Sequence, residues 1–502
     1  MTSLENNLRI SFNGKDSFTT QVGRIRSKII CTIGPRTAPI EKVGKLVDAG
    51  MNIARLNFSH GTHEYHSGVI KNLREYLAAS GRMCGIMLDT KGPEIRTGKL
   101  EGGKEIALTA GGTITLTTDA THVGNAQKIS HSYKSMATTV GEGSEILIDD
   151  GLLSLTCMTA DPATGDVVCR INNDGVLGET KGVNLPGATV DLPPLTEKDK
   201  ADLKFGCEQR VDMVAASFIR KASDVSQIRE FLTAHGGASI KIISKIENQE
   251  GLENFDRVLE ESDAIMVARG DMGVEIPIEK VSVAQKMMIS KCNVAGKPVI
   301  TATQMLDSMI KNPRPTRAET TDVANAVFDG SDCVMLSGET AKGDYPVEAV
   351  TTMVDICREA ERMLDYQYVF RALRSHHREF GMSVTETITS SAVKTAYDLS
   401  AAIIICLTET GNTAQLICKY RPVSPVICVT SNETTARQLF LHRGAFPMVV
   451  GSMVGTESLI ARVVNRSKAA GFIKKGDFVV VISGMREGVS GGANILRVIK
   501  EE

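Results

Sequence analysis

The segment Lys241–Glu247 (KIISKIE) is a short apolar run that ends in charged residues, and Asp263–Asp271 (DAIMVARGD) has the same form. Such runs are typical of strands buried on both faces of a parallel sheet. Six more runs share the pattern: Lys28–Gly34, Asn52–Ser59, Cys84–Thr90, Asp212–Phe218, Pro298–Gln304 and Asp332–Glu339. Amphipathic helical patterns lie between the runs, and this repeated alternation of strand and helix predicts an α/β fold, a (β/α)8 TIM barrel.

The spacing of the runs breaks once, between Thr90 and Asp212. Roughly 120 residues lie there, whereas about 15 to 25 would hold a loop and a helix. Alternating segments such as Glu145–Ile148 and Asp166–Ile171, with turn signals such as Asp150-Gly151, predict an inserted small β-barrel domain. Since this domain leaves the barrel at the carboxyl ends of the strands, where barrels hold their chemistry, we expect it to act as a lid.

After about Ala360 a second series of strand and helix patterns begins, which predicts a C-terminal open-sheet α/β domain. Its strands are expected at Ala401–Leu407, Pro425–Val429, Phe446–Val450 and Asp477–Ser483. The chain is therefore predicted to have an N-terminal arm, a catalytic barrel in two segments, a lid and a C-terminal domain for regulation or assembly. The predicted boundaries are 1–22 for the arm, 23–92 and 194–360 for the barrel, 93–193 for the lid and 361–502 for the C-terminal domain.

The charge of the 502-residue chain is nearly balanced, with 57 Lys and Arg against 59 Asp and Glu. The resulting net charge of −2 gives no reason to expect nucleic acid or an anionic membrane as a partner. The 11 cysteines form no CxxC pair, which fits buried thiols in a reducing compartment. The sequence has no signal-peptide pattern and no apolar stretch of roughly 18 to 20 residues, so we expect a soluble cytoplasmic protein.

Polar residues that close the predicted strands are the candidates for chemistry, because barrel active sites form at the carboxyl ends of strands. Strand alternation places Lys245 and Glu247 on the same face, so a cation and an anion share one site. Glu247 and Asp271 offer two hard oxygen ligands from neighbouring strands, which suit Mg²⁺ or Mn²⁺. No cluster of Cys and His in the sequence argues for zinc.

Three further cations, Arg55, Arg96 and Lys181, are candidates for binding phosphate oxygens. Each has a structural alternative. Arg55 could form an ion pair with Asp48 or Glu41, and the other two could be surface charges of the inserted domain.

Other polar groups at the same end of the barrel are open to two interpretations. The turn at Ala268–Gly273 could bind a carboxylate through free N–H groups, whereas Thr303 could merely satisfy a backbone group at a strand end. The histidines at 60, 63 and 66 lie near a predicted helix start, where loop histidines are seldom metal ligands.

Long strings of the chain are similar to those of the pyruvate kinase family, in the family's order from about Arg26 to Val347. They include KIICTIGP from Lys28, LDTKGPEIRTG from Leu88, KIISKIENQEG from Lys241, IMVARGDMGVE from Ile265 and LSGETAKGDYP from Leu336. The C-terminal third resembles the family more loosely. The resemblance implies transfer of the phosphoryl group of phosphoenolpyruvate to ADP, which gives pyruvate and ATP in glycolysis.

The resemblance also implies roles for the barrel residues that match. Glu247 and Asp271 would hold the divalent metal, Mg²⁺ or Mn²⁺. Lys245 would stabilise the transferring charge and the enolate, and Arg55 would bind the phosphate. Backbone near Gly270 and the hydroxyl of Thr303 would hold the substrate carboxylate, with Thr303 also near the enolate carbon that is protonated.

Two more sets follow from the same resemblance. The nucleotide-binding residues would be Asn57, His60, Arg96 and Lys181. The ligands of a monovalent cation, K⁺, would be Asn57, Ser59, Asp89 and Thr90. Family members with Glu at the position of Glu94 generally depend on K⁺, whereas those with Lys there do not, so we predict K⁺ activation.

Regulated relatives bind a sugar phosphate at a Thr/Ser-rich loop of the C-terminal domain. The matching candidates for an effector site in this chain are Thr408, Thr410, Gly411, Asn412 and Thr413. Glu409 adds a negative charge in this loop, and Met485 follows Ser483-Gly484 where some relatives have a Trp that stacks over the effector. We therefore expect fructose bisphosphate to activate poorly, if at all.

Two other functions remain open on the sequence. A barrel lyase or aldolase could use the same metal and Lys245 to stabilise an enolate, although the lid and Lys181 favour a nucleotide. An inactive relative could act as a binding protein, although no catalytic position of the family is replaced. The family also implies a homotetramer assembled through the barrel and C-terminal domains.

Overall fold

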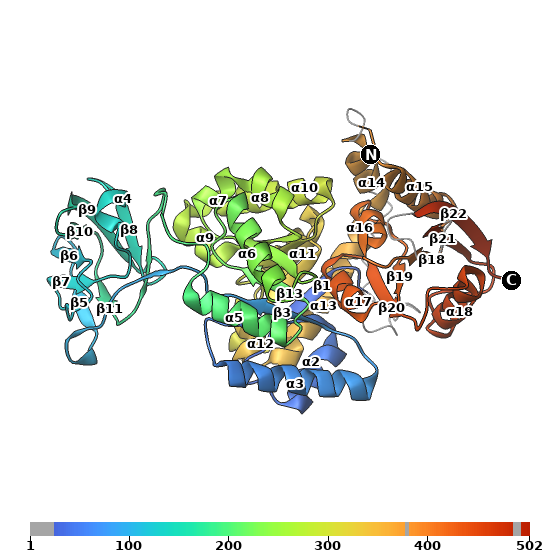
Figure 1. The fold of residues 1–502 in the computed structure, drawn as a ribbon, viewed down its shortest axis with the longest axis horizontal. Helices are drawn as coiled ribbons and strands as arrows, with labels where there is room; N and C mark the ends of the chain where they lie inside the picture. Colours follow the sequence, from blue (N-terminus) through green and yellow to red (C-terminus); the bar gives the residue numbers. More distant parts are fainter. Residues whose placement is uncertain (1–24, 377–380, 485–492) are drawn as a thin grey trace.

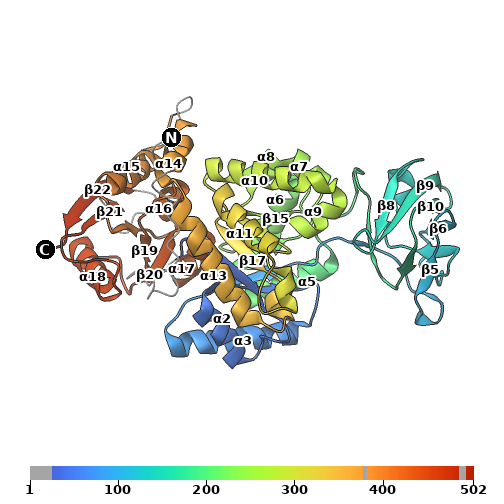
Figure 2. The same ribbon diagram turned by 180° about the vertical axis from the view of Figure 1, so that it is seen from behind.

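The computed structural model describes residues 25–376, 381–484 and 493–502, which form three folded parts in a row (Figure 1). The barrel lies in the middle, with the inserted β domain at one end and the C-terminal domain at the other (Figures 1 and 2). The predicted arm over 1–22 and residues 485–492, which include Met485, lie outside the described residues. Within those ranges, no helix has the length and apolar character needed to cross a membrane.

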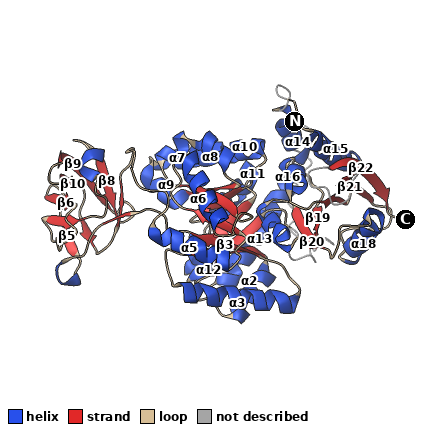
Figure 3. Ribbon diagram, in the orientation of Figure 1, coloured by secondary structure: helices blue, strands red, loops and turns tan. Residues whose placement is uncertain are grey.

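The central part is a closed barrel of parallel strands in the order β1-β17-β16-β15-β14-β13-β3-β2, as the sequence predicts. The strands are β1 Lys28–Thr32, β2 Met51–Asn57, β3 Gly85–Asp89, β13 Met213–Ala216, β14 Lys241–Ile246, β15 Ala264–Ala268, β16 Val299–Ala302 and β17 Cys333–Leu336. The helices around them include α2 Ile40–Ala49, α3 His63–Ser80, α5 Glu197–Glu208, α6 Ala222–Ala234, α8 Phe255–Glu261, α10 Val281–Ala295, α11 Arg317–Asp329 and α13 Pro346–Met363. Figure 3 shows these helices outside the strands.

The barrel strands read as continuous apolar runs because both of their faces are buried. One set of side chains, including Ile30, Ile53 and Ile243, fills the barrel interior. The alternate set, including Ile29 and Ile242, packs against the surrounding helices. The interior core also contains Leu441 of the C-terminal domain, so that domain packs on the barrel.

The inserted part is almost entirely β. Its main sheet has the order β4-β12-β8-β9-β10-β6-β7, and β11 pairs with β5 beside it. The strands are β4 Ile95–Arg96, β5 Ile106–Leu108, β6 Thr113–Thr117, β7 Lys128–Ser130, β8 Glu145–Ile148, β9 Leu153–Asp161, β10 Asp166–Ile171, β11 Gly175–Leu177 and β12 Gly182–Asn184, with the short helix α4 Met136–Thr139. This domain has a hydrophobic core of its own.

The C-terminal part is a sheet in the order β20-β19-β18-β21-β22 with apolar clusters on both faces. Its strands are β18 Ile403–Leu407, β19 Val426–Thr430, β20 Ala445–Val449, β21 Phe478–Gly484 and β22 Ala493–Lys500, and its helices include α14 Tyr366–Ser375, α15 Val384–Asp398, α16 Asn412–Lys419, α17 Glu433–Gln438 and α18 Thr456–Ala469. The first four strands match the predicted ones and run parallel. The sequence reading missed β22, an antiparallel edge strand that is partly exposed and therefore lacks a continuous apolar run.

Candidate active site

A cavity of about 630 Å³ opens at the carboxyl ends of the barrel strands, beneath residues of the inserted domain. It joins side chains that lie far apart in the sequence. Its lining includes Arg55, Asn57, Ser59, His60, Arg96, Lys245, Glu247 and Asp271, all predicted site residues, together with Lys91, Glu94, Thr180, Ser217 and Phe218. The barrel topology therefore brings most of the predicted site together in one place.

Lys245 is buried at the end of β14 and makes three polar contacts. Its Nζ lies 2.7 Å from Ser217 Oγ, 2.8 Å from Glu247 Oε1 and 3.2 Å from Asp89 Oδ1. Burial by itself would favour the neutral amine, but the carboxylates of Asp89 and Glu247 raise the pKa of Lys245 above its usual value. The side chain is therefore a fixed positive charge at neutral pH.

Glu247 is fully buried, and burial, with the nearby charge of Asp271, raises the pKa of its carboxyl to about 7. Its Oε2 accepts a hydrogen bond from the backbone N–H of Phe218. Its Oε1 contacts Lys245 Nζ without hydrogen-bond geometry and has no hydrogen-bond donor among the described residues. This buried carboxylate oxygen is therefore neutralised by the Lys245 ammonium, and with no hydrogen bond to fix its direction within the described chain it can also serve as a ligand to a metal ion beside Lys245.

The carboxylates of Glu247 and Asp271 fit a hard divalent ion, because both are oxygen donors on one cavity wall. In the ranges that the structure describes, no group of three or more His, Cys, Asp or Glu side chains is placed to hold a metal. An ion held here would thus have two protein carboxylates and would take its other ligands from water or substrate, the arrangement common for Mg²⁺.

Arg55 is buried near the end of β2, and its partner is Asp89 on the neighbouring strand β3. The two side chains are joined by an Nε–Oδ2 contact of 2.6 Å, and Arg55 Nη1 also donates to Thr32 Oγ1 at 2.9 Å. The alternative pairing of Arg55 with Asp48 is wrong, since Asp48 contacts Arg82 at 3.0 Å on the surface. Although burial opposes it, Arg55 and Lys245 together lower the pKa of Asp89.

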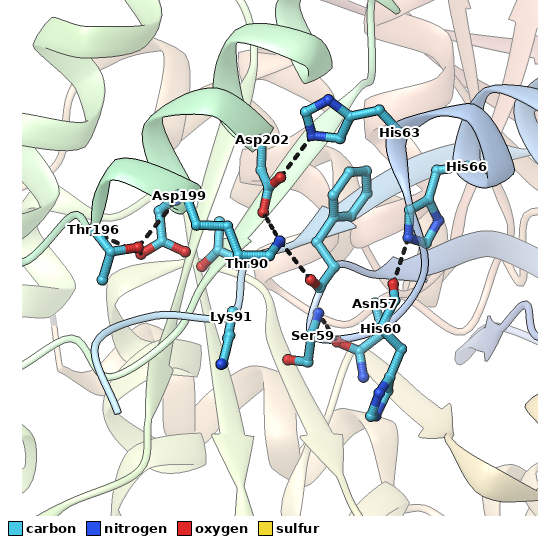
Figure 4. A network of polar contacts seen from close by, with 12 residues as sticks. Asn57, Ser59, His60, His63, His66, Thr90, Lys91, Thr196, Asp199 and Asp202 are labelled. Atoms are coloured by element: carbon cyan, nitrogen blue, oxygen red, sulfur yellow. Dashed lines mark hydrogen bonds and ion pairs between the residues drawn. The ribbon is translucent and has the colours of Figure 1, made fainter. Parts of the chain in front are cut away.

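The predicted monovalent-cation ligands, Asn57, Ser59, Asp89 and Thr90, come from two neighbouring strand ends. Asn57 pairs with Asp89 in the register of β2 and β3, so the two residues lie side by side. The backbone N–H of Ser59 donates to Asn57 Oδ1 at 3.1 Å, which shapes the loop after β2. Figure 4 shows Asn57, Ser59 and Thr90 in this region, and all four residues offer oxygen atoms, as a K⁺ site requires.

Gly270 and Thr303 are packed against each other at the ends of β15 and β16. A Cβ atom at Gly270 would lie 2.8 Å from Thr303 Cγ2, so only glycine fits without a shift. Thr303 has a φ of 74°, which is rare and strained for a β-branched residue. Arg269 holds this conformation, since its Nη2 donates to Thr303 O at 2.6 Å and its Nη1 contacts Asp322 at 2.7 Å.

The cations of the inserted domain have partners of their own. Arg96 contacts Glu94 at 2.6 Å and donates to Thr180 O at 2.7 Å. Lys181 pairs with Asp149 at 2.9 Å and lines a neighbouring cavity of about 290 Å³ between the inserted domain and the barrel, instead of the larger one. The two cavities adjoin, because Arg96 and Asp271 line both of them.

The three nearby histidines do not gather around one point. His63 Nε2 donates to Asp202 Oδ1 at 2.7 Å, and His66 Nε2 donates to the carbonyl of His60 at 2.9 Å. His60 itself lines the active-site cavity.

Ser217 and Phe218 are cavity residues that the sequence reading did not single out. Ser217 Oγ accepts from Lys245 and donates to Thr90 O at 2.7 Å, so it links the cationic and oxygen-rich parts of the cavity. The sequence does contain a signal for Ser217, because this polar residue directly follows the apolar run of β13, as other site residues follow their own strands.

The candidate effector loop, Thr408–Thr413, lies in the C-terminal domain between β18 and α16. Thr408 and Thr413 are buried, and the N–H of Gly411 donates to Thr408 Oγ1 at 3.0 Å. Thr410 and Gly411 line a small cavity of about 110 Å³ that also includes barrel residues such as Lys241. The loop preceding Asn412 is therefore shaped by its own hydroxyl contacts.

Comparison with known proteins agrees with this architecture along nearly the whole chain. Residues 24–350 match the model of the pyruvate kinase barrel domain, and residues 386–499 match that of the pyruvate kinase alpha/beta domain. A pyruvate kinase of Dictyostelium discoideum is 55% identical, with 99% of this chain and 98% of that protein covered. A cytosolic isozyme of pyruvate kinase from Glycine max is 48% identical, with 95% and 96% covered.

A solved structure gives the same result in three dimensions. The crystal structure of a pyruvate kinase from Cryptosporidium parvum superposes with a TM-score of 0.91 at 46% identity and covers 97% of this chain and 99% of that one. With the barrel, the C-terminal domain and near full-length relatives all in agreement, the chain belongs to the pyruvate kinase family and has pyruvate kinase activity.

Proposed function

We propose that phosphoryl transfer from phosphoenolpyruvate to ADP takes place in the 630 Å³ cavity, with Glu247 and Asp271 as the protein ligands of Mg²⁺ or Mn²⁺. The observation that carries this proposal is that the carboxylates of Glu247 and Asp271 line the same cavity as Lys245, whose Nζ lies 2.8 Å from Glu247 Oε1. When bound, the divalent ion supplies charge neutralisation for substrate oxygens. The protein itself then needs to position groups and to supply fixed charge, without a covalent intermediate.

Lys245 and Arg55 supply that fixed charge on the barrel side. Lys245 has a raised pKa and is held by Ser217, so its ammonium can stabilise the charge of the transferring phosphoryl group and of the enolate. Arg55 is oriented by Asp89 and binds a phosphoryl oxygen with its remaining N–H groups. Neither group has to reorganise during the reaction, because both are already in place.

The substrate carboxylate binds at the backbone near Gly270, where the side chain of Thr303 packs so closely that an added Cβ would lie 2.8 Å from Thr303 Cγ2. In this proposal the hydroxyl of Thr303 makes a second contact with the carboxylate and lies near the enolate carbon that is protonated. The strained backbone of Thr303, held by Arg269, is consistent with a residue kept in position for function.

ADP and ATP bind between the cavity and the inserted domain, with contacts from Asn57, His60, Arg96 and Lys181. Lys181 and Arg96 now contact carboxylates of the inserted domain. We propose that these two cations exchange those carboxylates for nucleotide phosphates when the lid closes, which also excludes water from the site. Deletion of the Lys181 charge by Lys181→Met would then raise the KM for ADP and leave divalent-metal binding unchanged.

K⁺ binds at Asn57, Ser59, Asp89 and Thr90, beside Arg55. The oxygen donors and their common position at two strand ends fit such an ion. Steady-state assays in KCl and in a tetraalkylammonium salt test this assignment. Activity should fall strongly without K⁺, and equal activity in both salts would reject the site.

A coupled ATP-formation assay with wild-type protein and Lys245→Met tests the proposed centre as a whole. ATP formation that is lost in the variant, with folding retained, is the expected result. Pyruvate formed without ATP would mean that the phosphoryl group is transferred to water, whereas the lyase or aldolase chemistry that the sequence left open predicts no ATP from either protein. Equal ATP formation by both proteins would show that Lys245 is not required and that other residues catalyse the reaction.

Regulation and assembly are further proposals. The loop with Thr408, Thr410, Gly411, Asn412 and Thr413 is the candidate effector site, and Glu409 in it makes fructose 1,6-bisphosphate a poor activator. Titration of sugar phosphates at low phosphoenolpyruvate tests this, since a large left shift of the saturation curve with that effector would contradict it. We also propose a cytoplasmic homotetramer with the domain boundaries predicted from the sequence, for which light scattering and limited proteolysis are direct tests.

A further inference from the structure

The loop that follows β2 is held from behind by side chains of two helices. This loop, residues 57–62, carries Asn57, Ser59 and His60 (Figure 4). His66 of α3 donates to the carbonyl of His60 at 2.9 Å, and its ring stacks on Phe58 with a centroid distance of 4.0 Å. One histidine thus contacts both Phe58 and His60 of this loop.

Lys198 of α5 provides the second support. Its Nζ donates to the carbonyl of Phe58 at 2.8 Å, directly between Asn57 and Ser59 in the sequence. Asp202, one turn further along α5, accepts from the same Nζ at 2.6 Å. The carboxylate of Asp202 is buried and also accepts from His63 Nε2 at 2.7 Å, so it joins α5 to the start of α3.

The same helix begins where the chain returns from the inserted domain, and it also contacts the connection that leads into that domain. Asp199 accepts from the backbone N–H of Gly92 at 3.0 Å, where the chain leaves the barrel just before Pro93. Its other oxygen accepts from the hydroxyl of Thr196 at 2.6 Å, where the chain has returned from the inserted domain. Figure 4 shows Thr196 and Asp199 at one side of the network and His63 and His66 at the other.

We infer that Lys198 is a positioning residue for the K⁺ and nucleotide loop, oriented by Asp202, and that α5 supports this loop and the base of the lid together. The inference rests on the proposed roles of Asn57, Ser59 and His60. Lys198 acts on them through the Phe58 carbonyl and does not itself line the active-site cavity. Its removal should therefore loosen K⁺ and nucleotide binding without disturbing Lys245, Glu247 or Asp271.

The test uses Lys198→Met with Lys200→Met as a matched control on the same helix. The two lysine side chains are similarly exposed, 46% and 44%, but Lys200 pairs with Glu197 instead of a loop carbonyl. In Lys198→Met, we expect the dissociation constant of a fluorescent N-methylanthraniloyl ADP to rise roughly five- to tenfold, because a charge-assisted hydrogen bond to the loop is lost. Lys200→Met should bind like the wild type.

Three further readouts separate positioning from a general loss of stability. The rise in Tm on replacing tetramethylammonium by K⁺ should shrink to about half, since ligand stabilisation follows affinity. The KM for ADP and the half-activating K⁺ concentration should rise, while kcat at saturation and Mn²⁺ binding measured by electron paramagnetic resonance stay within about twofold of the wild type. Lys198→Arg, which keeps a cationic donor, should recover most of the lost affinity.

Nucleotide affinity and K⁺ response that are equal in Lys198→Met and Lys200→Met would overturn the inference. A parallel fall of Mn²⁺ binding and kcat would also overturn it, because it would indicate a general structural role. If the wild-type protein binds the ADP analogue but does not respond to K⁺, only the proposed K⁺ site is rejected. The affinities of the variants for the ADP analogue would then decide the role of Lys198.

Discussion

Acidic side chains lie at both ends of the barrel, but their contacts differ between the amino end and the carboxyl end. At the amino end, Asp212, Asp263 and Asp332 each precede a strand and accept a backbone N–H from the neighbouring strand, at 2.8, 2.9 and 3.1 Å. Each also pairs with Arg or Lys. At the carboxyl end, Glu247 keeps an oxygen without a hydrogen-bond donor in the described chain. Acidic groups that are fully hydrogen-bonded stabilise the fold, whereas the Glu247 oxygen is paired with Lys245 at 2.8 Å inside a cavity, where both groups can take part in chemistry.

The C-terminal domain explains part of this difference. Arg421 contacts Asp332 through both carboxylate oxygens, at 2.6 and 2.9 Å, and Arg437 contacts Asp212 at 2.8 Å. The amino end is therefore closed by arginines from another domain, while the carboxyl end faces an open cavity and the inserted β domain. Variants at the two ends should accordingly separate stability from activity.

The largest effect is expected for Asp332→Ala at the amino end. It leaves Arg421 buried without its carboxylate, and breaking a buried ion pair from one side costs about 3–5 kcal/mol of unfolding free energy. Urea unfolding followed by circular dichroism measures the loss, and kcat of the folded protein should change little. A stability within about 1 kcal/mol of the wild type would contradict the structural role of the amino end.

The next largest effect is expected for Lys245→Met at the carboxyl end. The variant loses the ammonium that lies between Asp89 and Glu247, so kcat should fall by roughly 10²- to 10³-fold, as for other groups that stabilise transition-state charge. Steady-state kinetics with saturating substrates measure it, with circular dichroism to verify folding. A decrease of less than about tenfold would show that Lys245 is not central to the chemistry.

A smaller loss of kcat is expected for Ser217→Ala, a second variant at the carboxyl end of the barrel. The change removes the acceptor 2.7 Å from Lys245 Nζ and the donor to Thr90 O. A decrease in kcat of about tenfold is expected, because hydrogen bonds to charged groups contribute about 1.5–3 kcal/mol. Ser217→Cys, which keeps a weak acceptor of similar size, serves as the control. An unchanged kcat in Ser217→Ala would show that Ser217 does not position Lys245.

The smallest effect is expected for Arg82→Gln, outside both ends. Arg82 pairs with Asp48 at 3.0 Å, and both side chains are about half exposed. Exposed ion pairs contribute about 0–1 kcal/mol, so urea unfolding and kcat should both match the wild type closely. A loss comparable with that of Asp332→Ala would mean that burial does not separate the two kinds of ion pair.

Much of the fold could be predicted because the barrel strands are local patterns. The runs that contain β1, β2 and β14 are apolar on both faces, and the alternation in β14 correctly predicts that Lys245 and Glu247 meet. The edge strand β22 could not be predicted in the same way, because it is partly exposed and its pairing with β21 is set by the rest of the sheet.

The partners of charged side chains could not be predicted from the sequence. Arg55 has nearby acidic residues in the sequence, yet it pairs with Asp89, 34 positions away. The positive φ of Thr303 and the contact of Ser217 with Lys245 have no local signature either. Such features depend on which strand ends become neighbours when the barrel closes.

Periodicity and strand-end position are local properties of the chain, so the barrel strands, the inserted β domain and the proposed metal pair Glu247 and Asp271 could all be predicted from the sequence. The partner of each charged side chain, in contrast, follows only from the folded structure, as for Arg55 with Asp89. The physical reason is that hydrogen-bond satisfaction and burial are fixed by contacts between segments that are distant in sequence, such as Phe58 and Lys198.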